Sequence, residues 1–141
     1  MSKDAQEIYN LVKSGKLTPA DLEQSLGVAA NAAAAATASI QDWGVCYNSG
    51  TGQLSEYCTV VAANQSNPVI GLGMIAYKSD GSAMLAVQYT NDFTSPAVAT
   101  SIGTTRYNPQ SDGNTILCIV YGWTTAGNFY FSNTLAIVAC Q

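Results

Sequence analysis

Side chains that could carry out acid–base or nucleophilic chemistry are few and scattered in this sequence. It contains no histidine, so the commonest general base and the histidine-dependent triads are missing. Its nine carboxylates do not cluster. Asp80 and Asp112 each precede a glycine, where an aspartate usually forms a turn rather than an acid catalyst. We therefore predict that the protein is not an enzyme, has no catalytic residues and uses no cofactor.

Four cysteines, Cys46, Cys58, Cys118 and Cys140, are the remaining reactive groups. None belongs to a C-x-x-C pair and no histidine completes a zinc site, so we expect no metal. Four cysteines allow three disulfide pairings. Cys46 and Cys58 flank a turn-rich segment and could face each other across a hairpin. Alternatively, the cysteines are buried thiols in strands, because cysteine packs as a small hydrophobe.

Charge is scarce throughout the chain. Charged residues make up 10% of the sequence and hydrophobic residues 48%, and the net charge is −4. Residues 40–141 contain only Lys78 and Arg106 as cations. Because binding to phosphate backbones depends on clustered Lys and Arg, we expect no nucleic-acid partner. A polar surface of Ser, Thr, Asn, Gln and Gly is common in extracellular and self-associating β-proteins, so we expect a homo-oligomer.

No targeting segment is recognisable. The N-terminal residues MSKDAQEIYN lack the basic start and apolar centre of a signal peptide. No run reaches the roughly 20 apolar residues that span a bilayer as a helix. We expect a protein that is made soluble without a signal peptide and acts extracellularly or at a target membrane.

The hydrophobic pattern divides the chain into an N-terminal helical arm, residues 1–39, and a β-domain, residues 40–141. Apolar residues of the arm recur at helical spacing, and Thr18-Pro19-Ala20-Asp21 is a typical helix start. The apolar stripe of the helix that starts there continues through Leu22, Leu26, Ala29, Ala30 and Ala33.

The rest of the chain is expected to be mainly β. Short β-rich runs separated by Gly, Asn, Ser and Pro clusters predict a single antiparallel β-sandwich. We place seven strands near residues 43–48, 54–63, 68–77, 83–90, 97–107, 115–123 and 128–139.

The clearest hairpin signal is the stretch GLGMIAYKSDGSAMLAVQYT, residues 71–90. Asp-Gly between two apolar, β-rich runs predicts a primed turn, which needs φ > 0 at both central residues. We expect Gly71–Tyr77 to pair antiparallel with Ala83–Thr90.

This hairpin resembles the central hairpin of the actinoporins, and the order of a helical segment before a compact β-sandwich is similar too. Actinoporins are pore-forming cytolysins, and fungal fruit-body lectins share their fold. The resemblance implies a lipid-headgroup site in which Leu72 and Thr90 match family positions. Phe93 and Tyr107 are its aromatic candidates here. Asp92 stands where the family has a proline, which is a departure from the family's pocket.

The resemblance also implies that the N-terminal helix leaves the sandwich and inserts into the membrane, through Leu22, Leu26, Ala29 and Ala33. The alternative is an arm that packs on the sandwich or on a neighbouring chain. We therefore expect a membrane-binding, oligomerising, toxin-like cytolysin that recognises a lipid or glycan headgroup. A lectin or other ligand-binding sandwich, and a self-assembling structural protein, are the alternatives. Aromatic residues crowd the second half of the chain and serve either ligand stacking or the core.

Overall fold

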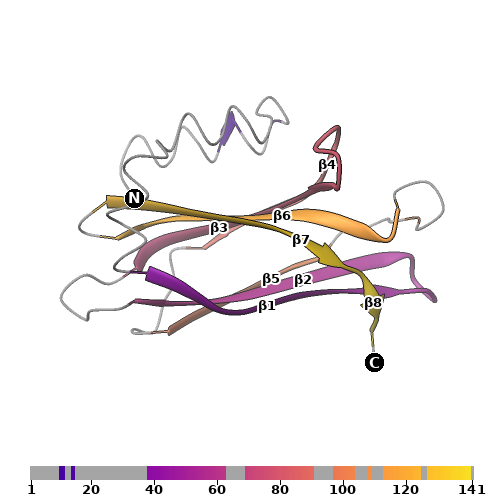
Figure 1. Cartoon of the computed structure of the whole chain (residues 1–141), viewed down its shortest axis with the longest axis horizontal. Helices are drawn as coiled ribbons and strands as arrows, with labels where there is room; N and C mark the ends of the chain where they lie inside the picture. Colours follow the sequence, from indigo (N-terminus) through magenta and orange to yellow (C-terminus); the bar gives the residue numbers. More distant parts are fainter. Residues whose placement is uncertain are drawn as a thin grey trace.

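The structure is a computed structural model of the chain, and it describes residues 10, 11, 14, 38–62, 69–90, 97–103, 108, 113–124 and 127–140. The strands form two four-stranded sheets, stacked as two layers in Figure 1. Sheet A has the order β5-β2-β1-β8 and sheet B the order β4-β3-β6-β7. The prediction of a mainly β sandwich is confirmed. The strands are β1 (Ala38–Asn48), β2 (Gln53–Ala62), β3 (Val69–Lys78), β4 (Met84–Thr90), β5 (Ala97–Gly103), β6 (Thr115–Thr124), β7 (Gly127–Ala136) and β8 (Val138–Ala139).

The predicted central hairpin is present. Strands β3 and β4 pair antiparallel, from Leu72 opposite Thr90 to Tyr77 opposite Met84. No helix occurs between residues 83 and 90. The two apolar, β-rich runs and the Asp-Gly turn signal were therefore sufficient to place this pair of strands.

The turn of this hairpin differs from the predicted primed turn. Gly81 has φ of 75°, but no described residue other than glycine has a positive φ, so Asp80 does not. The N–H of Gly81 donates to the Lys78 carbonyl at 2.7 Å, and the N–H of Ser82 donates to Oδ1 of Asp80 at 2.8 Å. The loop is therefore a longer one in which a single left-handed glycine suffices. Hydrogen bonds from Ser82 lower the pKa of the Asp80 carboxyl group.

Two strand boundaries were predicted wrongly. β1 begins at Ala38 rather than near residue 43, because Ala38 and Ser39 already pair with the end of β2. The strand expected over 128–139 is two strands, separated at Ile137. β7 belongs to sheet B, whereas β8 crosses to sheet A and pairs parallel with β1, so the sandwich is not wholly antiparallel.

One disulfide joins Cys46 of β1 to Cys140, just beyond β8. The proposed facing of Cys46 and Cys58 is wrong, because the β1–β2 register places Ser55 opposite Cys46 and Trp43 opposite Cys58. Cys58 and Cys118 are buried thiols, as the alternative predicted. The disulfide therefore holds β8 beside β1 at the edge of sheet A.

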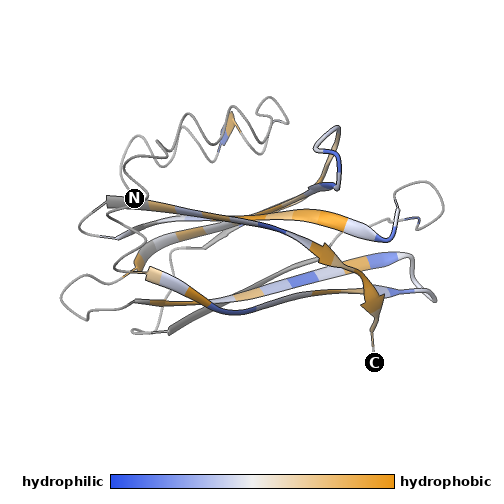
Figure 2. Ribbon diagram, in the orientation of Figure 1, coloured by the Kyte–Doolittle hydropathy of each residue, from blue (hydrophilic) through white to orange (hydrophobic). Residues whose placement is uncertain are grey.

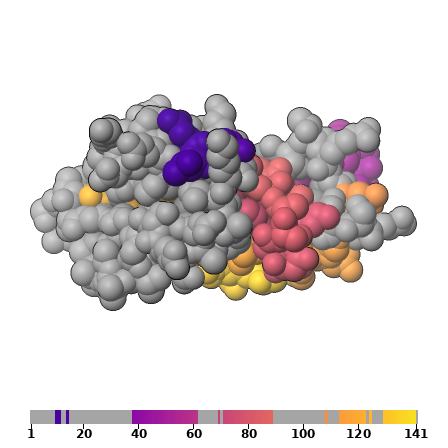
Figure 3. Space-filling view, turned by 90° about the horizontal axis from the view of Figure 1, so that it is seen from above, coloured from indigo at the N-terminus to yellow at the C-terminus, as the bar shows by residue number. Residues whose placement is uncertain are grey.

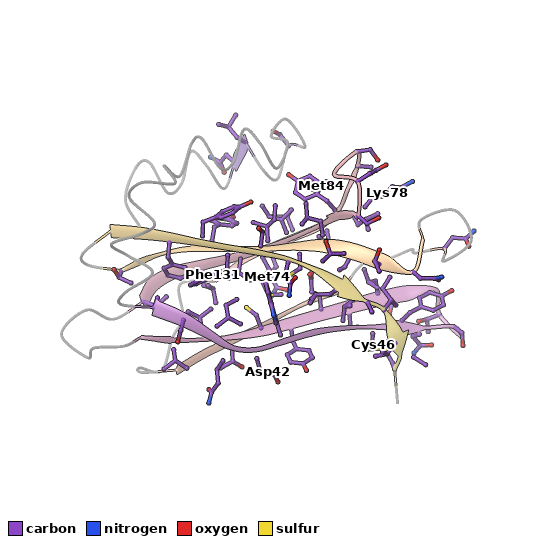
Figure 4. The ribbon with its side chains drawn as sticks, in the orientation of Figure 1. Asp42, Cys46, Met74, Lys78, Met84 and Phe131 are labelled. Carbon is purple, nitrogen blue, oxygen red and sulfur yellow. A yellow bond between two sulfur atoms is a disulfide. The ribbon has the colours of Figure 1, made fainter. Side chains whose placement is uncertain are left out.

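The main core lies between the two sheets. Met74 and Phe131 point into this space in Figure 4. Figure 2 shows the continuous apolar stretch of β6 that contributes to it. The larger core cluster consists of Ala38, Cys58, Val60, Val69, Leu72, Met74, Cys118, Val120 and Phe129. A second cluster in the same layer is formed by Val45, Leu54, Ala76 and Ile116.

Sheet B is also buried on its outer face, which points away from sheet A. Alternation along β3 and β6 places Ile75, Tyr77, Ile119 and Tyr121 on this face, opposite to the inward-facing residues. All four are almost completely buried, and Met84, Val87, Leu117 and Tyr130 pack against them. All the described strands belong to the two sheets, so none of them forms a layer over this face.

Three cross-strand pairs of a glycine and an aromatic residue shape the sheets. Gly73 is opposite Tyr121, Gly122 is opposite Phe129, and Gly44 is opposite Tyr57. In each pair the aromatic ring occupies the space that a Cβ atom of the glycine would need. Such pairs recover packing area that a glycine in a strand otherwise loses.

We expect Gly73→Ala to destabilise the protein by about 1–3 kcal/mol, the usual cost of overpacking a filled site. Its Cβ would overlap the ring of Tyr121. Denaturant unfolding measures this loss. The same substitution in a Tyr121→Leu background should cost less, because Leu has no ring atoms at that position. Equal losses in both backgrounds would show that ring overlap is not the cause.

We expect removal of the Cys46–Cys140 bond to lower the free energy of unfolding by up to about 4–5 kcal/mol. The bond closes a loop of 94 residues, whose closure entropy the unfolded chain would regain. Denaturant midpoints of the wild type with and without reductant, compared with Cys140→Ser, test this. A reductant effect that persists in Cys140→Ser would mean that another bond is responsible.

Candidate functional site

The predicted headgroup site is only partly within the described residues. The register pairs Leu72 directly with Thr90, so the structure brings these two candidates together at one end of sheet B. The Leu72 side chain is 0% exposed and belongs to the core between the sheets. Core packing therefore accounts for Leu72, and a contact of its side chain with a ligand stays a prediction. Phe93 and Tyr107 lie outside the described residues.

The candidate membrane-inserting residues Leu22, Leu26, Ala29 and Ala33 also lie outside the described residues. Of the predicted arm before β1, the structure describes Asn10, Leu11 and Ser14. The N–H of Ser14 donates to the Asn10 carbonyl at 3.0 Å, which is helical spacing, and Leu11 is exposed. Among the described residues, no helix is long and apolar enough to span a membrane.

Most described aromatic residues of the second half are packing residues. Tyr121 and Phe129 are fully buried, and Phe131 and Tyr130 are partly buried against core clusters. Figure 3 shows where the described β3–β4 hairpin, in pink, reaches the surface. An exposed aromatic side chain instead occurs in the first half, at Tyr57 of β2, which is 46% exposed.

Tyr57 lies on the outer face of sheet A. The buried residues of β2 lie on the opposite, inner face. A Cβ atom at Gly44 would come within 2.7 Å of Cε1 of Tyr57, so the phenol ring lies across the glycine backbone. Asp42 and Ser55 are exposed on neighbouring positions, and Figure 4 shows Asp42 pointing away from sheet B. The result is an exposed ring beside a carboxylate and a hydroxyl, an arrangement suited to stacking on an uncharged polar ligand.

Glu56 is a polar residue on the inner face of the same strand. It is 1% exposed, and within the described part of the chain its carboxylate oxygens have no hydrogen-bond donor stronger than the thiol of Cys118, a weak donor. Burial raises its pKa from 4.5 to about 7, and the nearby thiol of Cys118 partly opposes this rise. Burial is also the main cause of the raised pKa of the Cys118 thiol, with Glu56 adding to it.

Sequence analysis missed both Tyr57 and Glu56, although β2 carries a signal for each. Leu54, Cys58 and Val60 alternate with polar residues, and this period places Glu56 on the apolar face and Tyr57 on the other. The turn residues that flank other carboxylates, such as Asp80 and Asp112, give no information about Glu56. The alternation of β2 was therefore more informative than the positions of the carboxylates in turns.

The described residues contain no group of three or more His, Cys, Asp or Glu side chains arranged to hold a metal ion. No protein-family model and no curated protein matches this chain. Its function is therefore inferred from its own residues and their arrangement.

Proposed function

We propose that this protein binds membrane surfaces and oligomerises there, in the manner of an actinoporin-like cytolysin, with the N-terminal arm as its mobile element. The observation that carries the proposal is the apolar outer face of sheet B, where Ile75, Tyr77, Ile119 and Tyr121 are buried without a covering strand among those described. An apolar sheet face must be covered in water, by another part of the chain or by a partner.

The arm fits this face in size and chemistry. A helix over residues 19–37 would be about 28 Å long. The ten-residue strand β3 spans about 33 Å, so one helix along it would cover most of the face. The predicted stripe of Leu22, Leu26 and alanines supplies an apolar side for the contact. In the proposed resting state the arm covers sheet B, and at a membrane it exchanges this contact for lipid.

We expect the wild type to bind phosphatidylcholine vesicles and release an enclosed dye, and two variants to separate these steps. Phe93→Ala should reduce vesicle binding at least about tenfold, a loss of about 1.4 kcal/mol. Leu26→Asp should keep binding but lose dye release, because a carboxylate in the bilayer costs about 2.5–3.5 kcal/mol. Vesicle flotation measures binding and fluorescence measures release.

Both variants need a check of folding by circular dichroism and denaturant unfolding. A wild type that neither floats with vesicles nor releases dye would contradict the proposal. Dye release by Leu26→Asp at the wild-type rate would show that the arm does not insert.

A second candidate function is glycan binding on the outer face of sheet A, favoured by the exposure of Tyr57. Sugars stack on aromatic rings, and their hydroxyls hydrogen-bond to groups such as the Asp42 carboxylate and the Ser55 hydroxyl. Gly44 is part of this arrangement, because a side chain there would displace the ring. This site faces away from sheet B.

If sheet A binds glycans, Tyr57→Ala should lose glycan-array binding at least about tenfold, while Tyr57→Phe should retain most of it because the ring remains. Gly44→Ala should resemble Tyr57→Ala in binding. An array without signal for the wild type, or with equal signal for Tyr57→Ala, would exclude this site.

A further inference from the structure

Glu56 occupies a position in β2 that ordinarily holds an apolar residue. Leu54 and Cys58 are its neighbours on the inner face of the strand, and both are buried in core clusters between the sheets. The Glu56 side chain has the same degree of burial. An ionised carboxylate here would be removed from water with only weak hydrogen bonding from the described residues, which costs several kcal/mol.

The described groups around this carboxyl group offer little compensation. The β1 residue opposite Glu56 is Val45, which is buried and apolar. From β6 the Cys118 thiol faces Glu56, and Cys58 contributes a second thiol from β2 itself; both are weak donors. The inward-facing residues of β3 are apolar: Leu72, Met74 and Ala76. No Lys or Arg among the described residues interacts with the Glu56 carboxyl group.

We propose that Glu56 is a pH-dependent switch between the two sheets: its neutral form allows the sheets to close, and its ionisation favours a state in which they separate. Separation would hydrate the carboxylate and expose the buried thiols of Cys58 and Cys118. The proposal does not depend on whether the ligand is a lipid or a glycan.

The direction of the pH dependence follows from the pKa of Glu56. Its value in the folded protein, about 7, is above the ordinary value of 4.5, so the folded state holds this proton more tightly than the unfolded state. The stabilisation is fully present below about pH 4.5 and is lost as pH rises through about 7. The contribution of Glu56 to the stability of the closed sandwich is thus largest in acid.

Equilibrium unfolding of the full-length protein, measured by denaturant titration between about pH 5 and pH 8.5, tests this. We expect the unfolding constant of the wild type to rise about 10²-fold across this range. Glu56→Gln keeps the shape without the charge and should remove most of this rise. Asp42→Asn, which changes an exposed carboxylate of the same sheet, should keep it.

Alkylation of the two thiols reports opening directly. Both Cys58 and Cys118 are 0% exposed, so they react only when the sheets part. The ratio of the alkylation rate of the wild type to that of Glu56→Gln should rise with pH; dividing the two rates removes the ordinary effect of pH on thiol reactivity.

If Glu56→Gln does not fold, infrared spectroscopy of the wild type provides the test, through the carbonyl band of a protonated carboxylic acid that should disappear near pH 7. The proposal is overturned if this band is missing at about pH 6. An equal pH dependence of unfolding in the wild type and in Glu56→Gln would overturn it as well.

Discussion

The burial of β3 and β6 on both faces is the constraint on which the rest of the structure depends. A two-layer sandwich normally buries one face of each strand and leaves the other in water. Here every residue from Gly71 to Tyr77 is buried, and Ile116 and residues 118–122 are buried too. Among the described residues, β3 and β6 of sheet B are therefore the strands that are buried on both faces, although the described strands form only two layers. Burial on both faces explains why β3 and β6 are nearly continuous apolar runs.

The same constraint explains the glycines of sheet B. A strand that is buried on both sides must fit bulky side chains above and below, and large residues on neighbouring strands compete for the same space. Gly73 and Gly122 resolve this competition by leaving room for Tyr121 and Phe129. Ligand stacking and core packing were the two alternatives for the aromatic residues. The rings of Tyr121 and Phe129 are packing residues in the structure. In sheet A the corresponding pair, with Tyr57, faces solvent, so that its ring is available for binding.

Features set by local sequence were predictable, and features set by contacts between distant segments were not. The β3–β4 hairpin followed from two β-rich runs around Asp80-Gly81, although the number of left-handed residues in its turn did not. The passage of the chain from sheet B to sheet A at Ile137 has no local signal, because neither Pro nor Gly marks it. Cys140 reaches Cys46 only because the chain crosses to sheet A, so this disulfide could not be predicted from local sequence either. Leu72 matches a position of the actinoporin headgroup site and is also a core residue. Sequence alone could not distinguish a ligand contact from core packing at this position.

The outer faces of the two sheets differ in polarity and burial, so the sandwich has two chemically distinct sides. The outer face of sheet B is apolar and buried, whereas that of sheet A carries exposed Asp42, Ser55 and Tyr57. In the proposed membrane-bound state, the outer face of sheet B would meet lipid and the outer face of sheet A would face water. The two candidate binding surfaces therefore do not compete for space. Glu56 lies between them, so its ionisation acts on the contact that joins the two sheets and not on either outer surface.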